Sequence, residues 1–155
     1  MTVKEKLDHK QILLDISKRI LEERIAANQY TIDNAQAAAN EEGKSSAGDK
    51  YETSRAMSHL EKEMYSKQLA SNKNELAALL NIDCIKLMPE VAPGSVIKCA
   101  VCSFFIAAGL GKIKAGDEIV YFLSPHAPLA VILYQKKQGE NILLNGKNTI
   151  ILDIY

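Results

Sequence analysis

Hydrophobic residues recur at spacings of three, four or seven from residue 3 to about residue 40, in a stretch without Gly or Pro. This period places them on one face of an α-helix, so the stretch predicts a long amphipathic helix. A second apolar stripe near its start indicates that the base of this helix contacts something besides its main partner. The main face consists of Leu7, Leu14, Leu21, Ile25, Ile32, Ala35 and Ala39, and the second stripe of Leu13, Ile16 and Ile20.

The helical pattern resumes from about residue 50 to residue 80, again without Gly or Pro. Two long helices joined by a short break most simply fold back on each other as an antiparallel hairpin. Asn28 and Asn72 fall near the expected seam, where a buried amide fixes the register, although solvated positions are the alternative for both. The residues available for packing on the second helix are Tyr51, Met57, Leu60, Met64, Leu69, Leu76 and either Leu79 or Leu80.

The composition changes after "MPEVAPGS", where Pro and Gly end the helical region and β-branched or aromatic runs begin. These short runs are separated by Gly-containing turns and predict strands, and the pair Asn145 and Gly146 between two apolar runs predicts a hairpin. The stretch "SPHAPLAVILYQ" predicts one short helix, with Ser124 as its N-cap and Pro125 at its first helical position.

The sequence therefore predicts an α+β protein. Residues 1–80 are expected to form a long antiparallel helical hairpin, a coiled coil, with its tip near residues 41–50. Residues 81–94 are expected to form a linker, and residues 95–155 a small, mostly antiparallel sheet domain with one short helix.

The even balance of charges argues against two classes of function. The chain has 155 residues, with 19 Lys and Arg against 19 Asp and Glu, so no net field favours bulk binding of nucleic acid or of a membrane surface. The N-terminal "MTVKEKLDHKQ" lacks the apolar segment of a signal peptide, and no apolar run reaches the roughly 18 residues of a membrane span. We expect a cytoplasmic protein without membrane contact, and a monomer because the hairpin satisfies its own seam.

Candidate chemistry in the chain is sparse. The three cysteines do not form a disulfide framework, and "CAVC" has no second pair of ligands to complete a zinc site. Because its context is strand-like, Cys99 and Cys102 are expected to point to opposite faces of a strand. The three histidines, His9, His59 and His126, are isolated from one another and from any nucleophile arrangement. We therefore predict no catalytic residue and no metal site.

The C-terminal half carries the most specific resemblance to a known family. The stretch "GDEIVYFLSPHAPLAVILYQKKQGENI" leads from a strand to Ser-Pro, a short helix, and a basic turn with Gly and an acidic residue, and "NGKNTIILDIY" follows as a closing strand. This order resembles that of the bacterial Gre-type transcript cleavage and elongation factors. With the long hairpin ahead of it, the resemblance covers nearly the whole chain and implies that the C-terminal domain has an FKBP-like fold.

The resemblance also implies the partners. Gre factors bind bacterial RNA polymerase, dock their C-terminal domain near the secondary channel and insert the hairpin into that channel. By this resemblance the docking candidates are Lys112, Pro125 and His126, the hairpin tip is expected to contact nascent RNA, and DNA is met only through the polymerase complex. An FKBP-like fold does not imply prolyl isomerase activity.

The tip departs from the family at the positions that matter for cleavage. Gly43 and Tyr51 are eight residues apart, as are the Gly and Tyr in the family's tip pattern GDLxENAEY. That register puts Lys44 and Ala47 where the family has the carboxylates that help hold a second Mg²⁺ and activate water. We therefore expect a regulator of elongation that is not itself an enzyme, without strong cleavage stimulation. We expect no cofactor of its own, and any Mg would be shared with the polymerase active site.

Two other functions remain open. Glu41, Glu42 and Asp49 stand near the tip, so a cleavage-competent factor that uses them with Mg is the first alternative, although capping of the second helix is the favoured role of Asp49. A hairpin-bearing interaction module unrelated to the polymerase is the second. The tip lysines are candidates for contact with RNA phosphates. The candidate tip residues are Glu41, Glu42, Gly43, Lys44, Asp49, Lys50 and Tyr51.

Overall fold

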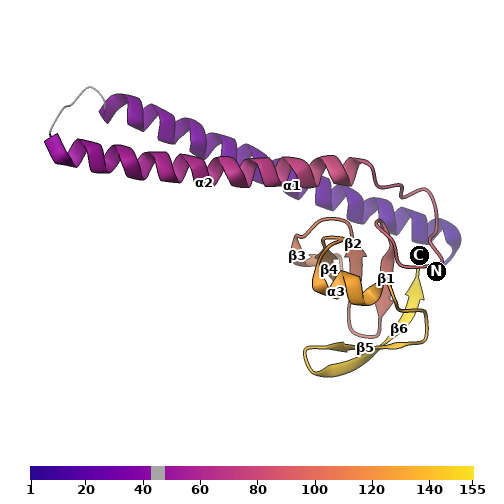
Figure 1. Ribbon diagram of the computed structural model, residues 1–155. Coiled ribbons are helices and arrows are strands. Elements are labelled where there is room, and N and C mark those ends of the chain that lie inside the picture. Colours follow the sequence, from indigo (N-terminus) through magenta and orange to yellow (C-terminus); the bar gives the residue numbers. More distant parts are fainter. Residues whose placement is uncertain (43–47) are drawn as a thin grey trace. The chain divides into compact units, whose positions relative to one another are not determined.

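A computed structural model describes the backbone of residues 1–42 and 48–155 and the side chains of residues 1–41 and 55–155 (Figure 1). The chain divides into two compact units. The hairpin unit is Arg19–Ala77, and the sheet unit combines Met1–Lys18 with Ala78–Tyr155. The predicted division into residues 1–80, 81–94 and 95–155 stays a prediction, while the predicted α+β class is confirmed.

The two long helices are α1 (Val3–Glu42) and α2 (Gly48–Leu80). Within the hairpin unit, later residues of α1 contact earlier residues of α2. Asn28 is hydrogen-bonded to Asn72, and Gln36 to Lys62. The two helices of this unit therefore run antiparallel, as the break between them predicts.

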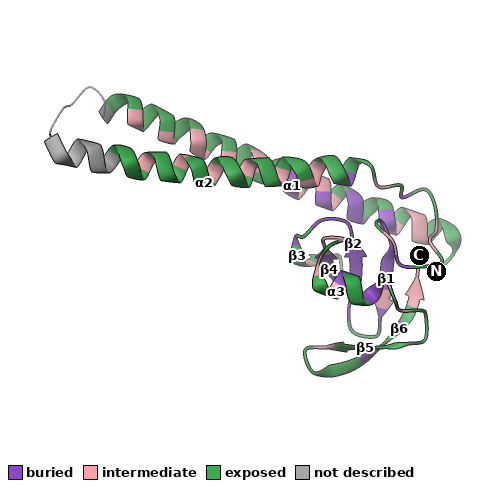
Figure 2. Ribbon diagram, viewed as in Figure 1, coloured by how far each residue is buried: buried purple, intermediate pink, exposed green. Residues whose placement is uncertain are grey.

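The seam of the hairpin unit matches the prediction on α1 but not throughout α2 (Figure 2). The predicted α1 residues Ile25, Ile32, Ala35 and Ala39 are all half-buried, at steps of seven, three and four. On α2, however, Met57, Leu60 and Met64 are 61%, 67% and 48% exposed. The half-buried positions with heptad spacing on α2 include polar residues: they are Ser58, Lys62, Tyr65, Leu69, Asn72 and Leu76, and Glu75 beside them is also half-buried.

Asn28 and Asn72 form a hydrogen-bonded pair between the helices. The Asn72 Nδ2 donates to Asn28 Oδ1 at 3.0 Å, and Asn28 Nδ2 donates to Gln68 Oε1 at 3.1 Å. Both asparagines are half-buried. The pair therefore lies on the seam, where a polar contact favours one register over its neighbours.

Replacing Asn28 and Asn72 together by Leu is expected to stabilise the hairpin, because the seam gains apolar contact and Gln68, which loses its bond from Asn28, is exposed to water. We expect a gain of about 1 kcal/mol, below the value for a fully buried Leu because the site is half-buried. Urea unfolding measures it, with the exposed Asn74→Leu as the control. A double variant less stable than wild type would show that the amide pair is itself a net source of stability.

The sheet unit contains a six-stranded sheet in the order β3-β4-β2-β1-β6-β5. Four neighbouring pairs are antiparallel and β2 with β4 is parallel, so the sheet is mixed: it is mostly antiparallel, as predicted, with one parallel pair that the sequence did not indicate. The parallel pair arises because β3 occupies the edge and returns the chain to β4 beside β2. The strands are β1 (Val96–Cys99), β2 (Ser103–Ile106), β3 (Gly111–Ala115), β4 (Glu118–Leu123), β5 (Asn141–Leu144) and β6 (Lys147–Ile154).

The predicted hairpin at Asn145 and Gly146 is confirmed. Leu144 pairs with Lys147 across it, and the two turn residues have φ of 49° and 78°. Positive φ at both central positions is typical of the type I′ turn, whose twist suits paired strands.

The short helix α3 (Pro128–Leu133) begins three residues later than the sequence predicts. Its N-cap is Ala127, not Ser124, and its first helical residue is Pro128, not Pro125. A helix starting at Pro125 would need a helical residue before Pro128 and a donor N–H at Pro128, and proline opposes both. Ala127 is accordingly extended, with φ −63° and ψ 143°.

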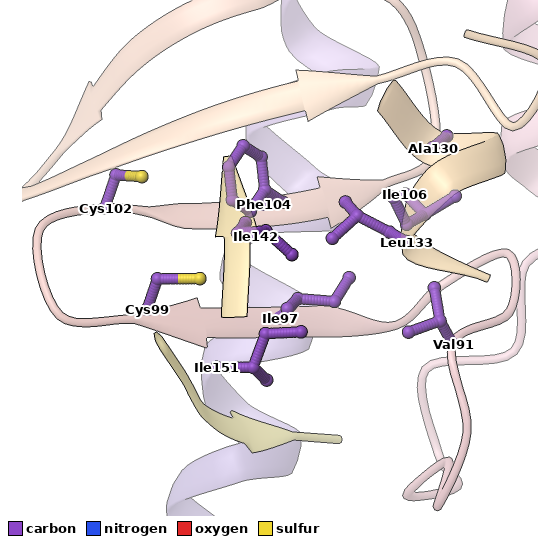
Figure 3. Close-up of a cluster of buried hydrophobic side chains, with 10 residues drawn as sticks. All are labelled: Val91, Ile97, Cys99, Cys102, Phe104, Ile106, Ala130, Leu133, Ile142 and Ile151. Carbon is purple, nitrogen blue, oxygen red and sulfur yellow. The ribbon is translucent and has the colours of Figure 1, made fainter. Parts of the chain in front are cut away.

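The main apolar core of the sheet unit lies between one face of the sheet and α3 (Figure 3). Strands β1 and β2 supply its centre, α3 covers it, and β5 and β6 add one residue each. The buried members of this cluster are Val91, Ile97, Cys99, Cys102, Phe104, Ile106, Ala130, Leu133, Ile142 and Ile151.

Candidate functional site

The predicted tip lies where α1 ends and α2 begins. Glu41 is exposed in the last turn of α1. The remaining tip residues lie outside the described side chains, and Gly43 and Lys44 outside the described backbone as well. Residues 49–51 belong to the first turn of α2. The tip residues whose side chains are not described are Glu42, Gly43, Lys44, Asp49, Lys50 and Tyr51.

The three docking candidates lie at one end of the sheet. Lys112 is exposed on the edge strand β3, opposite Tyr121 of β4. Pro125 is half-buried and His126 exposed just after β4 ends, where the His126 N–H faces the Ser124 Oγ at 3.4 Å. Because β3 and β4 are antiparallel, the start of β3 and the residues after β4 share one end. The structure thus brings together residues that are twelve or more positions apart in sequence.

A polar network that the sequence did not predict centres on Glu118 of β4. Its Oε1 accepts a hydrogen bond from the Ser103 hydroxyl and lies 3.9 Å from Lys98 Nζ, while its Oε2 lies 3.4 Å from His9 Nε2. The other ring nitrogen, His9 Nδ1, is 2.7 Å from the Tyr155 hydroxyl. We call these five residues the Glu118 network, and they join the first turns of α1 to strands β1, β2 and β4.

The Glu118 network favours a neutral His9. Burial lowers the pKa of His9, and the nearby Glu118 carboxylate opposes that shift without reversing it. A neutral ring can accept a hydrogen bond from the Tyr155 hydroxyl at Nδ1 and direct its Nε2–H toward Glu118. Burial also raises the pKa of Tyr155, with the carboxylates of Glu118 and Asp153 adding to the shift, so its hydroxyl stays protonated as the donor.

The contacts of the Glu118 network hold neighbouring elements together. Glu118 Oε1 accepts from Ser103 of β2, and Oε2 faces His9 of α1, so this side chain connects β4 to both. An adjoining cavity of about 560 Å³ is lined by His9, Glu118 and Asp117, among others. Across the residues that the structure describes, no group of three or more His, Cys, Asp or Glu is arranged to hold a metal ion.

Lys10 makes a second connection between α1 and the rest of the sheet unit. Its side chain is fully buried, and Nζ donates to the carbonyl oxygen of Lys86 at 2.7 Å. Burial lowers the pKa of Lys10, while the neighbouring Cys84 and Asp83 oppose the shift. The second apolar stripe of α1 indicated a contact at the base of this helix, and Leu13 is indeed buried. The polar part of this contact, which His9 and Lys10 make, was not predicted from the sequence pattern.

Protonation of His9 is expected to destabilise the protein in mild acid. Its pKa is lowered in the folded state, so the unfolded chain binds the proton more readily and stability falls as pH decreases below about 6.5. Urea unfolding at about pH 5 and about pH 7.5 should show a smaller loss for His9→Gln than for wild type. His59→Gln and His126→Gln, at exposed positions, are the controls and should keep the wild-type loss. An unchanged loss in His9→Gln would contradict this assignment.

No family model, no curated protein and no solved structure matches this chain. Among the helices of the described residues, none combines the length and apolar character needed to cross a bilayer.

Proposed function

We propose that this protein is a Gre-like regulator that binds bacterial RNA polymerase and inserts its helical hairpin into the secondary channel. The observation that carries the proposal is the antiparallel hairpin of α1 and α2, followed in the chain by a sheet unit with one short helix. At about 1.5 Å per residue, the 33 residues of α2 alone provide a rod of about 50 Å. A rod of that length suits a narrow channel better than a flat docking surface.

The sheet unit is proposed to dock at the channel entrance and to have an FKBP-like fold. Its six strands and single short helix are consistent with that fold, and the exposed Lys112 and His126 at one end offer polar contacts to a partner. The protein would act in the cytoplasm as a monomeric accessory factor, not as an enzyme, and would meet nascent RNA at its tip.

The tip sequence supports modulation without strong cleavage. Mg²⁺ takes hard oxygen ligands in near-octahedral geometry, and a lysine or an alanine supplies none. Lys44 and Ala47 occupy the two positions where the resemblance places carboxylates. Any Mg in the complex would therefore be held mainly by the polymerase.

Binding to purified core polymerase at low salt tests the proposal. We expect co-elution on gel filtration, and weaker binding for Lys112→Glu combined with His126→Ala. Lys147→Glu, which reverses an exposed charge at the turn between β5 and β6, is the control and should bind as wild type. Absence of any complex would overturn the proposal and favour an interaction module unrelated to the polymerase.

A second assay separates the proposed function from cleavage competence. Backtracked complexes supplied with Mg²⁺ and the wild-type protein should show little shortening of the RNA 3′ end. Strong shortening that is lost when Glu41, Glu42 and Asp49 are all replaced by Ala would establish the cleavage-competent alternative instead.

A further inference from the structure

The Cys-x-x-Cys segment does not have the geometry that its strand-like sequence predicts. Residues 100–102 connect β1 to β2, so Cys99 ends one strand and Cys102 immediately precedes its partner strand, instead of both lying on one strand. Both belong to the same buried cluster, and both side chains leave the β1–β2 hairpin on one side (Figure 3). The expectation that they point to opposite faces is wrong, because the chain reverses between them.

The hydrogen bonding of this hairpin places the two cysteines opposite each other. Lys98 pairs with Ser103, and one step nearer the turn the Cys99 N–H donates to the Cys102 carbonyl oxygen at 2.9 Å. Hydrogen-bonded antiparallel partners have Cα atoms about 5.5 Å apart. That value falls within the range of about 4.4 to 6.8 Å found across disulfides.

A cavity adjoins the cysteine pair. Cys99 and Cys102 line the cavity of about 560 Å³ beside the Glu118 network, although they are only 5% and 7% exposed. The turn residues Ala100 and Val101 line this cavity and also a second one of about 580 Å³ next to β5 and β6. Both turn residues therefore border cavities on the surface of the hairpin end.

We propose that Cys99 and Cys102 are a site of reversible oxidation to an intramolecular disulfide by a small-molecule disulfide such as oxidised glutathione. One thiolate attacks a sulfur of the reagent, which forms a mixed disulfide and releases one thiol. The second thiolate then attacks the protein sulfur of that mixed disulfide and releases the second thiol. Two protein thiols are oxidised, one reagent disulfide is reduced to two thiols, and a dithiol reverses the process.

The proposal predicts a characteristic pH dependence. Burial, with a contribution from Cys102, raises the pKa of Cys99 to about 11, and burial with the nearby Glu118 raises that of Cys102. Only thiolates attack disulfides, so the rate should rise about tenfold per pH unit between about pH 7 and pH 9. The two thiols are thus slow to oxidise at neutral pH. Their oxidation state does not depend on the proposed polymerase binding.

Thiol counting after acid quench and denaturation tests the proposal. Folded wild type treated with oxidised glutathione at about pH 8.5 should fall from three thiols to one, and dithiothreitol should restore three. Cys84→Ser should fall from two to none without retaining glutathione, as mass spectrometry shows. Cys99→Ser and Cys102→Ser, which cannot close the bond, should instead retain the glutathione adduct.

The proposal would be overturned if the folded protein, with unchanged circular dichroism, keeps all three thiols, or if Cys84→Ser retains bound glutathione or forms dimers. Polymerase binding is measured separately, so a failure here leaves the proposed function untouched, and the reverse also holds.

Discussion

If the proposed function holds, replacing Lys44 by Asp and Ala47 by Glu is expected to raise transcript cleavage stimulation above that of the wild type. The exchange supplies carboxylate oxygens at the two positions where the resemblance to Gre factors places them, and it removes a cation that would repel Mg²⁺. A second bound metal can stabilise both the attacking and the leaving oxygen of the phosphodiester. A lower barrier by about 1.4 kcal/mol raises the rate about tenfold, and we expect at least that gain on backtracked complexes.

A matched control exists in the same hairpin. Lys67 and Ala70 have the same residue types and the same spacing, and both are exposed on α2 away from the tip. Lys67→Asp with Ala70→Glu therefore changes the charge equally without placing carboxylates at the tip, and it should leave cleavage at the wild-type level. If the tip variant binds polymerase but cleaves no faster than this control, the register between Gly43 and Tyr51 is wrong.

The sequence predicted the elements better than it predicted their contacts. On α1 the seam is apolar enough that hydrophobic spacing alone identifies it. On α2 the seam carries Ser58 and Lys62, while Leu60 and Met64 face solvent, so a hydrophobic pattern selects the neighbouring face. The heptad spacing from Tyr65 to Leu76 is the signal that would have located the seam.

The polar contacts were not predictable for a different reason. His9 and Tyr155 are 146 positions apart, and Glu118 belongs to a third element, so only the packed fold brings them together. The cysteine pair was misplaced because the connection through Ala100 and Val101 contains no Gly, Asn or Asp and so gives no turn signal. The start of α3, by contrast, was recoverable, since Pro128 alone excludes a helix that begins at Pro125.

Removing the side chain of Tyr155 is expected to cause the largest loss of stability outside the central core. The residue is only 1% exposed, and its N–H and carbonyl pair with those of Val96 at 3.0 and 2.7 Å. Its ring lies beneath Lys6 Nζ at 5.1 Å and beside the His9 ring at 6.1 Å. Truncating a buried aromatic residue to Ala costs about 3–5 kcal/mol. That is a large share of the roughly 5–15 kcal/mol that stabilises a typical domain.

Two variants of Tyr155 separate packing from hydrogen bonding. Tyr155→Phe keeps the ring and removes the donor to His9 Nδ1, so it leaves a half-buried acceptor without its partner and should cost about 1–3 kcal/mol. In urea unfolding, Tyr155→Ala should lower the free energy of unfolding clearly more than Tyr155→Phe does. Tyr30, which is 70% exposed, is the matched control, and its change to Phe should alter stability by less than about 0.5 kcal/mol.

The Tyr155→Phe variant also tests whether the Glu118 network acts as one unit. If the Tyr155 hydroxyl and His9 interact directly, the double variant Tyr155→Phe with His9→Gln should lose less stability than the sum of the two single losses. The difference, the coupling energy, should be about 0.5–3 kcal/mol. Additive losses would mean that the 2.7 Å contact contributes nothing of its own. In that case α1 would be held to the sheet unit by Leu13, Lys10 and the Lys6–Asp153 ion pair without help from His9.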